Sequence, residues 1–107
     1  MRPKPGEVWL ADLGLAAKTR PVVIVSREDE SPPRALATYV PLTTQYRGSA
    51  YEVPLGRLPF LREASFVNTQ GIGSFPIARL ERKIGTVPAA AIDDIRSALR
   101  LALCLER

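Results

Sequence analysis

The stretch RPVVIVS, residues 20 to 26, decides which fold the chain can form. Its apolar residues Val22 to Val25 follow one another without a polar interruption, and three of the four are valine. Unbroken runs of β-branched residues are typical of strands that are buried on both faces. We therefore expect Arg20 to Ser26 to be a strand in the middle of a β-rich core.

Other short apolar segments flank this strand, separated by a loop over Gly14–Thr19 and a Pro-containing loop over Arg27–Arg34. Because proline cannot donate to a β ladder, Pro41 predicts that the second half of its strand is an edge or a bulge. Ile77–Glu81 is expected to form a single helical turn. The expected strands are Glu7–Leu13, Ala35–Thr43, Tyr51–Leu55, Ala64–Thr69 and Arg82–Val87, with a turn over Tyr46–Ala50.

The sequence changes period after Pro88, which suits the first turn of a helix. From there the apolar residues recur at helical spacing, and acidic residues precede basic ones, the order that the helix dipole favours. We expect a mainly β (α+β) protein in which one C-terminal helix packs on a strongly bent antiparallel sheet or open barrel. The periodic apolar residues are Ile92, Ile95, Leu99, Ala102 and Leu103.

Length and composition indicate one ordinary globular domain over residues 1–107. The chain has 107 residues, of which 46% are hydrophobic and 24% are charged. Its net charge is +4, and twelve of its fifteen basic residues are arginine. Arginine grips phosphate oxygens with a planar fork, so the composition is compatible with nucleic-acid binding. A solvated surface that is rich in arginine is the alternative.

The sequence excludes several common kinds of site. It contains no histidine and one cysteine, Cys104, so a Ser-His-Asp triad, an internal disulfide and a Cys/His metal cluster are all impossible. The acidic run Glu28–Glu30 is interpreted as a solvated loop. We therefore expect no metal and no cofactor. No apolar run has the length of a signal peptide or a membrane span, so a cytoplasmic protein is expected.

Two strand ends remain as candidates for chemistry: Lys18–Pro21, before the buried strand, and Pro41–Gln45, after the next one. Both place small polar groups or cations where a rigid strand meets a loop, a position that holds functional groups well. The alternative is structural: the threonines satisfy turn backbone, and Arg20 pairs with a surface carboxylate.

Several motifs resemble those of the MazF/PemK toxins. Pro5–Leu13 (PGEVWLADL) is similar to their opening strand, Thr19–Ser26 (TRPVVIVS) to their Arg-Pro-Val strand, and Val40–Gln45 (VPLTTQ) to their Pro-x-Thr-Thr strand end. Ser65–Gln70 and Lys83–Val87 fit the later strands. Together the matches run in order along nearly the whole chain.

The resemblance implies an SH3-like barrel of the MazF/PemK/CcdB type. Members are homodimeric endoribonucleases that cut single-stranded RNA such as mRNA at short sequences. An acidic, partly disordered antitoxin silences them. The chain would thus be an endoribonuclease that has RNA and a cognate antitoxin as partners and does not contact a membrane.

By the same resemblance, the catalytic arginine corresponds to Arg20 and the catalytic threonine to Thr43. Arginine can stabilise the charge that builds on phosphate oxygens when the ribose 2′-hydroxyl attacks, and threonine can donate to the same oxygens. The expected products are a cyclic phosphate and a 5′-hydroxyl, and no general base is identified. The candidate RNA-binding residues are Lys18, Thr44, Gln45, Arg47, Ser65 and Gln70.

One departure concerns the loop before the Arg-Pro strand. In the family it is often longer, with a glycine-rich stretch and a glutamate, whereas here it is only Gly14–Thr19. Lys18 is the candidate phosphate contact in this loop, and an exposed loop lysine is the alternative.

Two other classes of function compete with RNA cleavage. One is a toxin with the same barrel that poisons gyrase by binding it. Such toxins depend on their last residues, and Leu103–Arg107 does not resemble that ending. The other is a barrel that binds nucleic acid or a peptide without catalysis, which would have no need for the pair Arg20 and Thr43.

Overall fold

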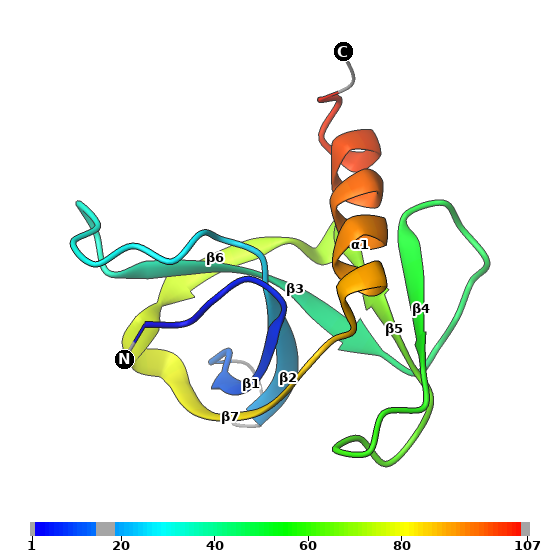
Figure 1. Ribbon diagram of the computed structural model, residues 1–107, viewed down its shortest axis with the longest axis horizontal. Helices are drawn as coiled ribbons and strands as arrows, with labels where there is room; N and C mark the ends of the chain where they lie inside the picture. The colour runs from blue at the N-terminus through cyan, green and yellow to red at the C-terminus, as the bar shows by residue number, and fades with distance from the viewer. Residues whose placement is uncertain (1, 15–18, 106–107) are drawn as a thin grey trace.

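The computed structural model describes residues 2–14 and 19–105. They form an antiparallel β-sheet, two short 3₁₀ turns and a C-terminal helix (Figure 1). The strands are β1 (Glu7–Asp12), β2 (Thr19–Ile24), β3 (Leu36–Thr43), β4 (Glu52–Gly56), β5 (Ser65–Asn68), β6 (Gly73–Pro76) and β7 (Leu80–Thr86); the turns are η1 (Thr69–Gly71) and η2 (Ile77–Arg79), and the helix is α1 (Ala89–Ala102).

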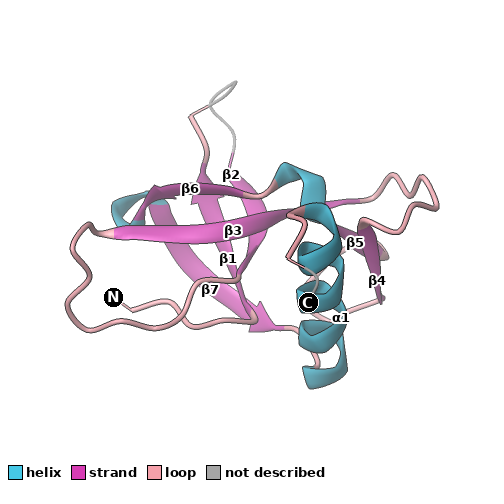
Figure 2. Cartoon of the chain, turned by 90° about the horizontal axis from the view of Figure 1, so that it is seen from above, coloured by secondary structure: helices cyan, strands magenta, loops and turns pink. Residues whose placement is uncertain are grey.

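Strand β3 joins the two parts of the sheet. The strand order is β4-β5-β3-β2-β1-β7, and β6 pairs with β3 outside this path. The sheet curls, so that β1, β2, β6 and β7 lie on one side of α1 and β4 and β5 on the other, with β3 running from one side to the other (Figure 1). Figure 2 shows β3 running along the molecule towards β5. This mainly β architecture with one terminal helix confirms the expected fold class.

Strand β2 is buried on both faces, as its sequence predicts. Val22, Val23 and Ile24 have no exposed surface. Because alternate side chains of a strand point to opposite faces, Val23 belongs to one apolar cluster and its two neighbours belong to the other. The first cluster also holds Val8, Val40 and Ile95, and the second holds Ala11, Ala37, Phe75 and Leu80.

Helix α1 covers the first of these clusters. Pro88 precedes its first turn, and Ala91, Ile95 and Ala98 are its buried residues. Ile92 and Leu99 are half-buried against the same cluster. The two buried alanines let the helix approach the sheet closely. Among the described residues, no helix is long and apolar enough to cross a membrane.

Pro41 marks a change of partner in β3, where an edge or a bulge was expected. Pairing with β2 ends at Pro41, and Leu42 and Thr43 then pair with β5 on the other side only, so this half of the strand is paired along one edge. Proline has no N–H to donate to a neighbouring strand, so β3 can change partners at Pro41 without leaving a backbone donor unpaired. The short strand β6 was not expected, because it has only four residues, beginning with glycine and ending with proline. The expected turn is present as η2, and β7 begins directly after it.

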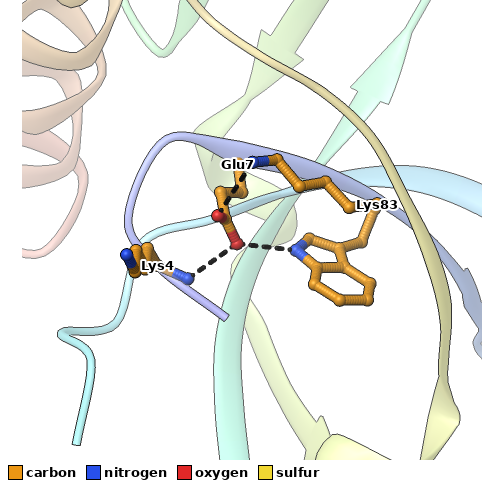
Figure 3. Close-up of polar contacts among 4 residues, drawn as sticks. Lys4, Glu7 and Lys83 are labelled. Atoms are coloured by element: carbon orange, nitrogen blue, oxygen red, sulfur yellow. Dashed lines mark hydrogen bonds and ion pairs between the residues drawn. The ribbon is translucent and has the colours of Figure 1, made fainter. Parts of the chain in front are cut away.

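The carboxylate of Glu7 ties the start of the chain to the last strand (Figure 3). It accepts hydrogen bonds from the backbone N–H of Lys4 at 2.9 Å and from the indole Nε1–H of Trp9 at 3.0 Å. Its other oxygen lies 3.1 Å from Nζ of Lys83 in β7. Burial of the carboxyl raises its pKa, but the hydrogen bonds from Lys4, Trp9 and Lys83 and the charge of Lys83 outweigh this, so the pKa of Glu7 lies below its ordinary value of 4.5.

We predict that Glu7→Gln lowers the free energy of unfolding at neutral pH by about 1–2 kcal/mol, because the amide loses the charge-assisted contacts. A carboxyl whose folded-state pKa is depressed stabilises the fold above its unfolded pKa and loses that contribution as the pH falls through the folded pKa. The difference between wild type and variant should therefore shrink below about pH 4.5. Urea unfolding at several pH values measures it.

The control is Glu28→Gln, which removes the same charge from an exposed loop residue. It should change stability by less than about 0.5 kcal/mol. A Glu7→Gln variant that is as stable as Glu28→Gln at neutral pH would contradict the structural role of this carboxylate.

Candidate active site

The two candidate strand ends meet in one surface pocket. Strands β2 and β3 are antiparallel, with Val22 paired with Pro41. The start of β2 and the end of β3 are therefore neighbours, and Arg20 and Thr43 line the same pocket. The pocket is lined by Arg20, Pro21, Leu42, Thr43, Thr44, Gln45 and Ser65.

The hydroxyl of Thr43 is oriented by its own turn. Its Oγ1 accepts a hydrogen bond of 3.0 Å from the backbone N–H of Gln45, so its proton is available for a group in the pocket. The backbone of Thr43 is fixed on the other side by pairing with Phe66 of β5. Thr43 therefore does satisfy turn backbone, as the structural alternative expects. This hydrogen bond uses the oxygen of Thr43 as an acceptor and does not use its hydroxyl proton.

The side chain of Arg20 is exposed at the start of β2, where its backbone pairs with Ala11 of β1. Within residues 2–14 and 19–105 the ion pairs are Arg2–Glu30 and Lys83–Glu7. The alternative expectation, that Arg20 pairs with a surface carboxylate, thus finds no support in the described part of the chain. The guanidinium of Arg20 is therefore a cation whose backbone is fixed by strand pairing, and it can bind an anion.

The other candidate residues are placed differently. Thr44 and Gln45 are exposed in the pocket wall. Ser65 is buried, and its hydroxyl donates to the backbone carbonyl of Glu63 at 3.1 Å, so it shapes the wall. Gln70 lies in η1 and is not among the residues that line the pocket. Lys18, the candidate phosphate contact, lies outside the described residues.

Arg47 lies just beyond the pocket, in a loop held by Glu52, a residue that the sequence analysis did not single out. The Glu52 carboxylate accepts hydrogen bonds from the backbone N–H of Arg47 at 3.2 Å and from the N–H and hydroxyl of Ser49 at 3.0 and 2.9 Å. These bonds, those of Ser49 first, lower the pKa of Glu52. The spacing Ser-x-x-Glu from Ser49 to Glu52 is the sequence signal that could have indicated this contact.

The chemistry open to the pocket follows from its donors. It offers a guanidinium and a hydroxyl proton to an anion, together with amide and threonine groups. In the part of the chain that the structure describes, no group of three His, Cys, Asp or Glu side chains could hold a metal ion. The arrangement suits binding of a phosphate and stabilisation of negative charge on it.

Comparison with known proteins identifies the class. Residues 4–103 match the model of the family described as PemK-like, MazF-like toxin of type II toxin-antitoxin system. The chain therefore belongs to the PemK/MazF toxin family. This agrees with the resemblance of its motifs.

Individual relatives support this family assignment. The chain is 34% identical over 89 residues to endoribonuclease MazF3 of Mycobacterium tuberculosis, covering 83% of this chain and 86% of the relative. It is 34% identical over 107 residues to the probable endoribonuclease MazF5 of that species, covering 98% and 96%. A solved mycobacterial endoribonuclease in complex with its cognate antitoxin has a TM-score of 0.84 and 30% identity, with 98% of each chain covered.

Proposed function

We propose that the pocket of Arg20 and Thr43 is the active site of an endoribonuclease toxin that cuts single-stranded RNA without a metal ion. The chain is an endoribonuclease of the MazF type by family, and its curated relatives carry that name. The observation that carries the site assignment is the meeting of the exposed guanidinium and the free hydroxyl proton in one pocket, each on the end of a paired strand.

In the proposed reaction the ribose 2′-oxygen attacks the adjacent phosphorus. The new 2′-O–P bond closes a cyclic phosphate while the P–O5′ bond breaks; the 2′-hydroxyl gives its proton to water, and the departing 5′-oxygen takes a proton from water and leaves as a hydroxyl. Negative charge grows on the non-bridging oxygens, where Arg20 offers its fork and Thr43 its proton. No pocket side chain is a good proton acceptor at neutral pH, so we assign these two residues to charge stabilisation and positioning, and we assign no general base.

RNA and an acidic antitoxin are the proposed partners, and the cytoplasm is the proposed compartment. The net charge of +4 and the exposed cations Arg20 and Arg47 favour a polyanion at this face. An acidic antitoxin segment would be attracted by the same charges. In support, the mycobacterial endoribonuclease whose structure matches with a TM-score of 0.84 was solved in complex with its cognate antitoxin.

A homodimer is proposed from the end of α1. Leu101, Leu103 and Leu105 are 42%, 45% and 55% exposed, whereas the buried side of the helix is Ala91, Ile95 and Ala98. Leu103 and Leu105 also line a surface groove with Val25, Ile72 and Leu99. Apolar surface of this kind in a small protein suits contact with a second copy around a two-fold axis.

We predict that Arg20→Ala and Thr43→Ala each lower the RNA cleavage rate about 10²–10³-fold, because each removes a contact to the developing charge. Arg20→Lys should also fail, since lysine lacks the fork. Thr43→Ser keeps the hydroxyl and should retain most activity, whereas Thr43→Val should not. Gel analysis of a long single-stranded RNA measures the rates, and thermal melting checks the fold.

The matched control is Arg34→Ala, which removes one exposed arginine near the opposite end of β3. It should cut RNA within about twofold of wild type. Near wild-type cleavage by Arg20→Ala or Thr43→Ala at an unchanged melting temperature would show that the site assignment is wrong.

We predict that cleavage continues in excess EDTA, because the proposed reaction uses a guanidinium and a hydroxyl where other nucleases use Mg²⁺. The assay is the same long RNA with and without the chelator. Activity that disappears in EDTA and returns with Mg²⁺ would show that cleavage depends on a metal ion. The assignment of the pocket as the active site would then still be tested by the Arg20 and Thr43 variants.

We predict that the protein sediments at micromolar concentration with about twice the 11.7 kDa mass of the chain. Leu103→Glu places a charge on the exposed apolar surface and should shift the distribution towards the monomer. A wild-type protein that sediments as a single chain would contradict the dimer. A dimer that Leu103→Glu leaves intact would show that another surface forms it.

A further inference from the structure

A stacked pair of aromatic rings borders the candidate active site. The ring centroids of Tyr46 and Phe66 are 4.4 Å apart and their planes differ by 10°. Each ring belongs to the residue that directly follows a pocket residue, Gln45 or Ser65. The pair therefore joins the segment after β3 to strand β5 at the edge of the pocket.

The sheet register places this pair on the same face as the proposed catalytic threonine. Phe66 is the direct partner of Thr43 in the β3–β5 ladder. Directly paired residues of antiparallel strands carry their side chains on one face of the sheet. The ring of Phe66 thus lies on the face of Thr43, with the ring of Tyr46 stacked against it.

Tyr46 is ordered but exposed. Phe66 is half-buried, whereas Tyr46 keeps 51% of its surface exposed, more than most apolar or aromatic residues of the described chain. The loop that follows is fixed by the bonds from Arg47 and Ser49 to the Glu52 carboxylate. One face of the Tyr46 ring is therefore held in place, and the exposed ring surface is positioned before any ligand arrives.

We propose that Tyr46 is a stacking platform for an unpaired RNA base next to the cleaved phosphate, an inference that rests on the proposed function. Proteins bind splayed bases of single-stranded RNA on aromatic rings. A platform that is already ordered loses little entropy when it binds. The adjacent Arg47 supplies a cation for the neighbouring backbone phosphate. Since every base has a π face, this contact adds affinity and positions the strand with little base selectivity.

The experiment measures RNA affinity apart from chemistry. A cut site is first mapped with wild-type protein on a long RNA. A short oligonucleotide spanning that site then carries a 2′-deoxy nucleotide at the attacking position, so that it binds without being cut. Dissociation constants are compared for wild type, Tyr46→Phe, Tyr46→Leu and the control Leu36→Ala, which truncates a residue that is 45% exposed at the other end of β3.

We expect Tyr46→Leu to weaken binding about 10–100-fold, because it keeps an apolar contact with Phe66 but has no π face. Tyr46→Phe and Leu36→Ala should bind like wild type, and all four proteins should melt at similar temperatures. Replacing single bases by abasic residues should reveal one nucleotide whose loss weakens wild type but not Tyr46→Leu.

Several results would overturn the platform. These are wild-type affinity in Tyr46→Leu, equal losses in Tyr46→Phe and Tyr46→Leu, or abasic penalties that are the same in wild type and Tyr46→Leu. Unchanged RNA affinity combined with weaker antitoxin binding would assign the ring to a protein partner instead. A wild-type protein that neither binds nor cuts RNA would refute the proposed function itself, which separates that failure from the failure of the platform.

Discussion

Burial of β2 on both faces is the constraint on which the rest of the structure depends. Val22 and Ile24 belong to one apolar cluster and Val23 to the other, so a shift of β2 by one residue would exchange the two sets. Within the described residues, the other six strands and the helix are arranged so that both faces of β2 are covered. The pairing of β2 with β3 also brings the strand ends that carry Arg20 and Thr43 to one pocket.

The pocket gains its rigidity from elements that have no chemistry of their own. The start of β2 is held by β1, and the end of β3 is held by β5. The loop after β3 is held by the Glu52 carboxylate. Each contact restricts a backbone segment, so side chains at the pocket meet a substrate with little reorganisation.

The sequence was informative where a local pattern decides the structure. The Val/Ile run from Val22 specified the doubly buried strand, and the period after Pro88 specified the helix. Strand β6 could not be predicted from a local pattern, because the four residues Gly73–Pro76 form a strand only through pairing with β3.

The same distinction applies to the site. Thr43 and Arg20 stand at the ends of recognisable strands, so their neighbourhood was predictable. The stacking of Tyr46 on Phe66 depends on the register between β3 and β5, which no local pattern encodes. Gln70 was a candidate by the family resemblance alone; it lies in η1 and does not line this pocket, so its contact with RNA stays a prediction.

The origin of the pocket in adjacent strands makes the site a property of the folded sheet. Its lining residues come from three segments of the sequence, residues 20–21, 42–45 and 65, which the pairing of β2 with β3 and of β3 with β5 brings together. No single segment carries the full set of groups. A chain in which these strands fail to pair would therefore lack the site altogether, whatever secondary structure it keeps.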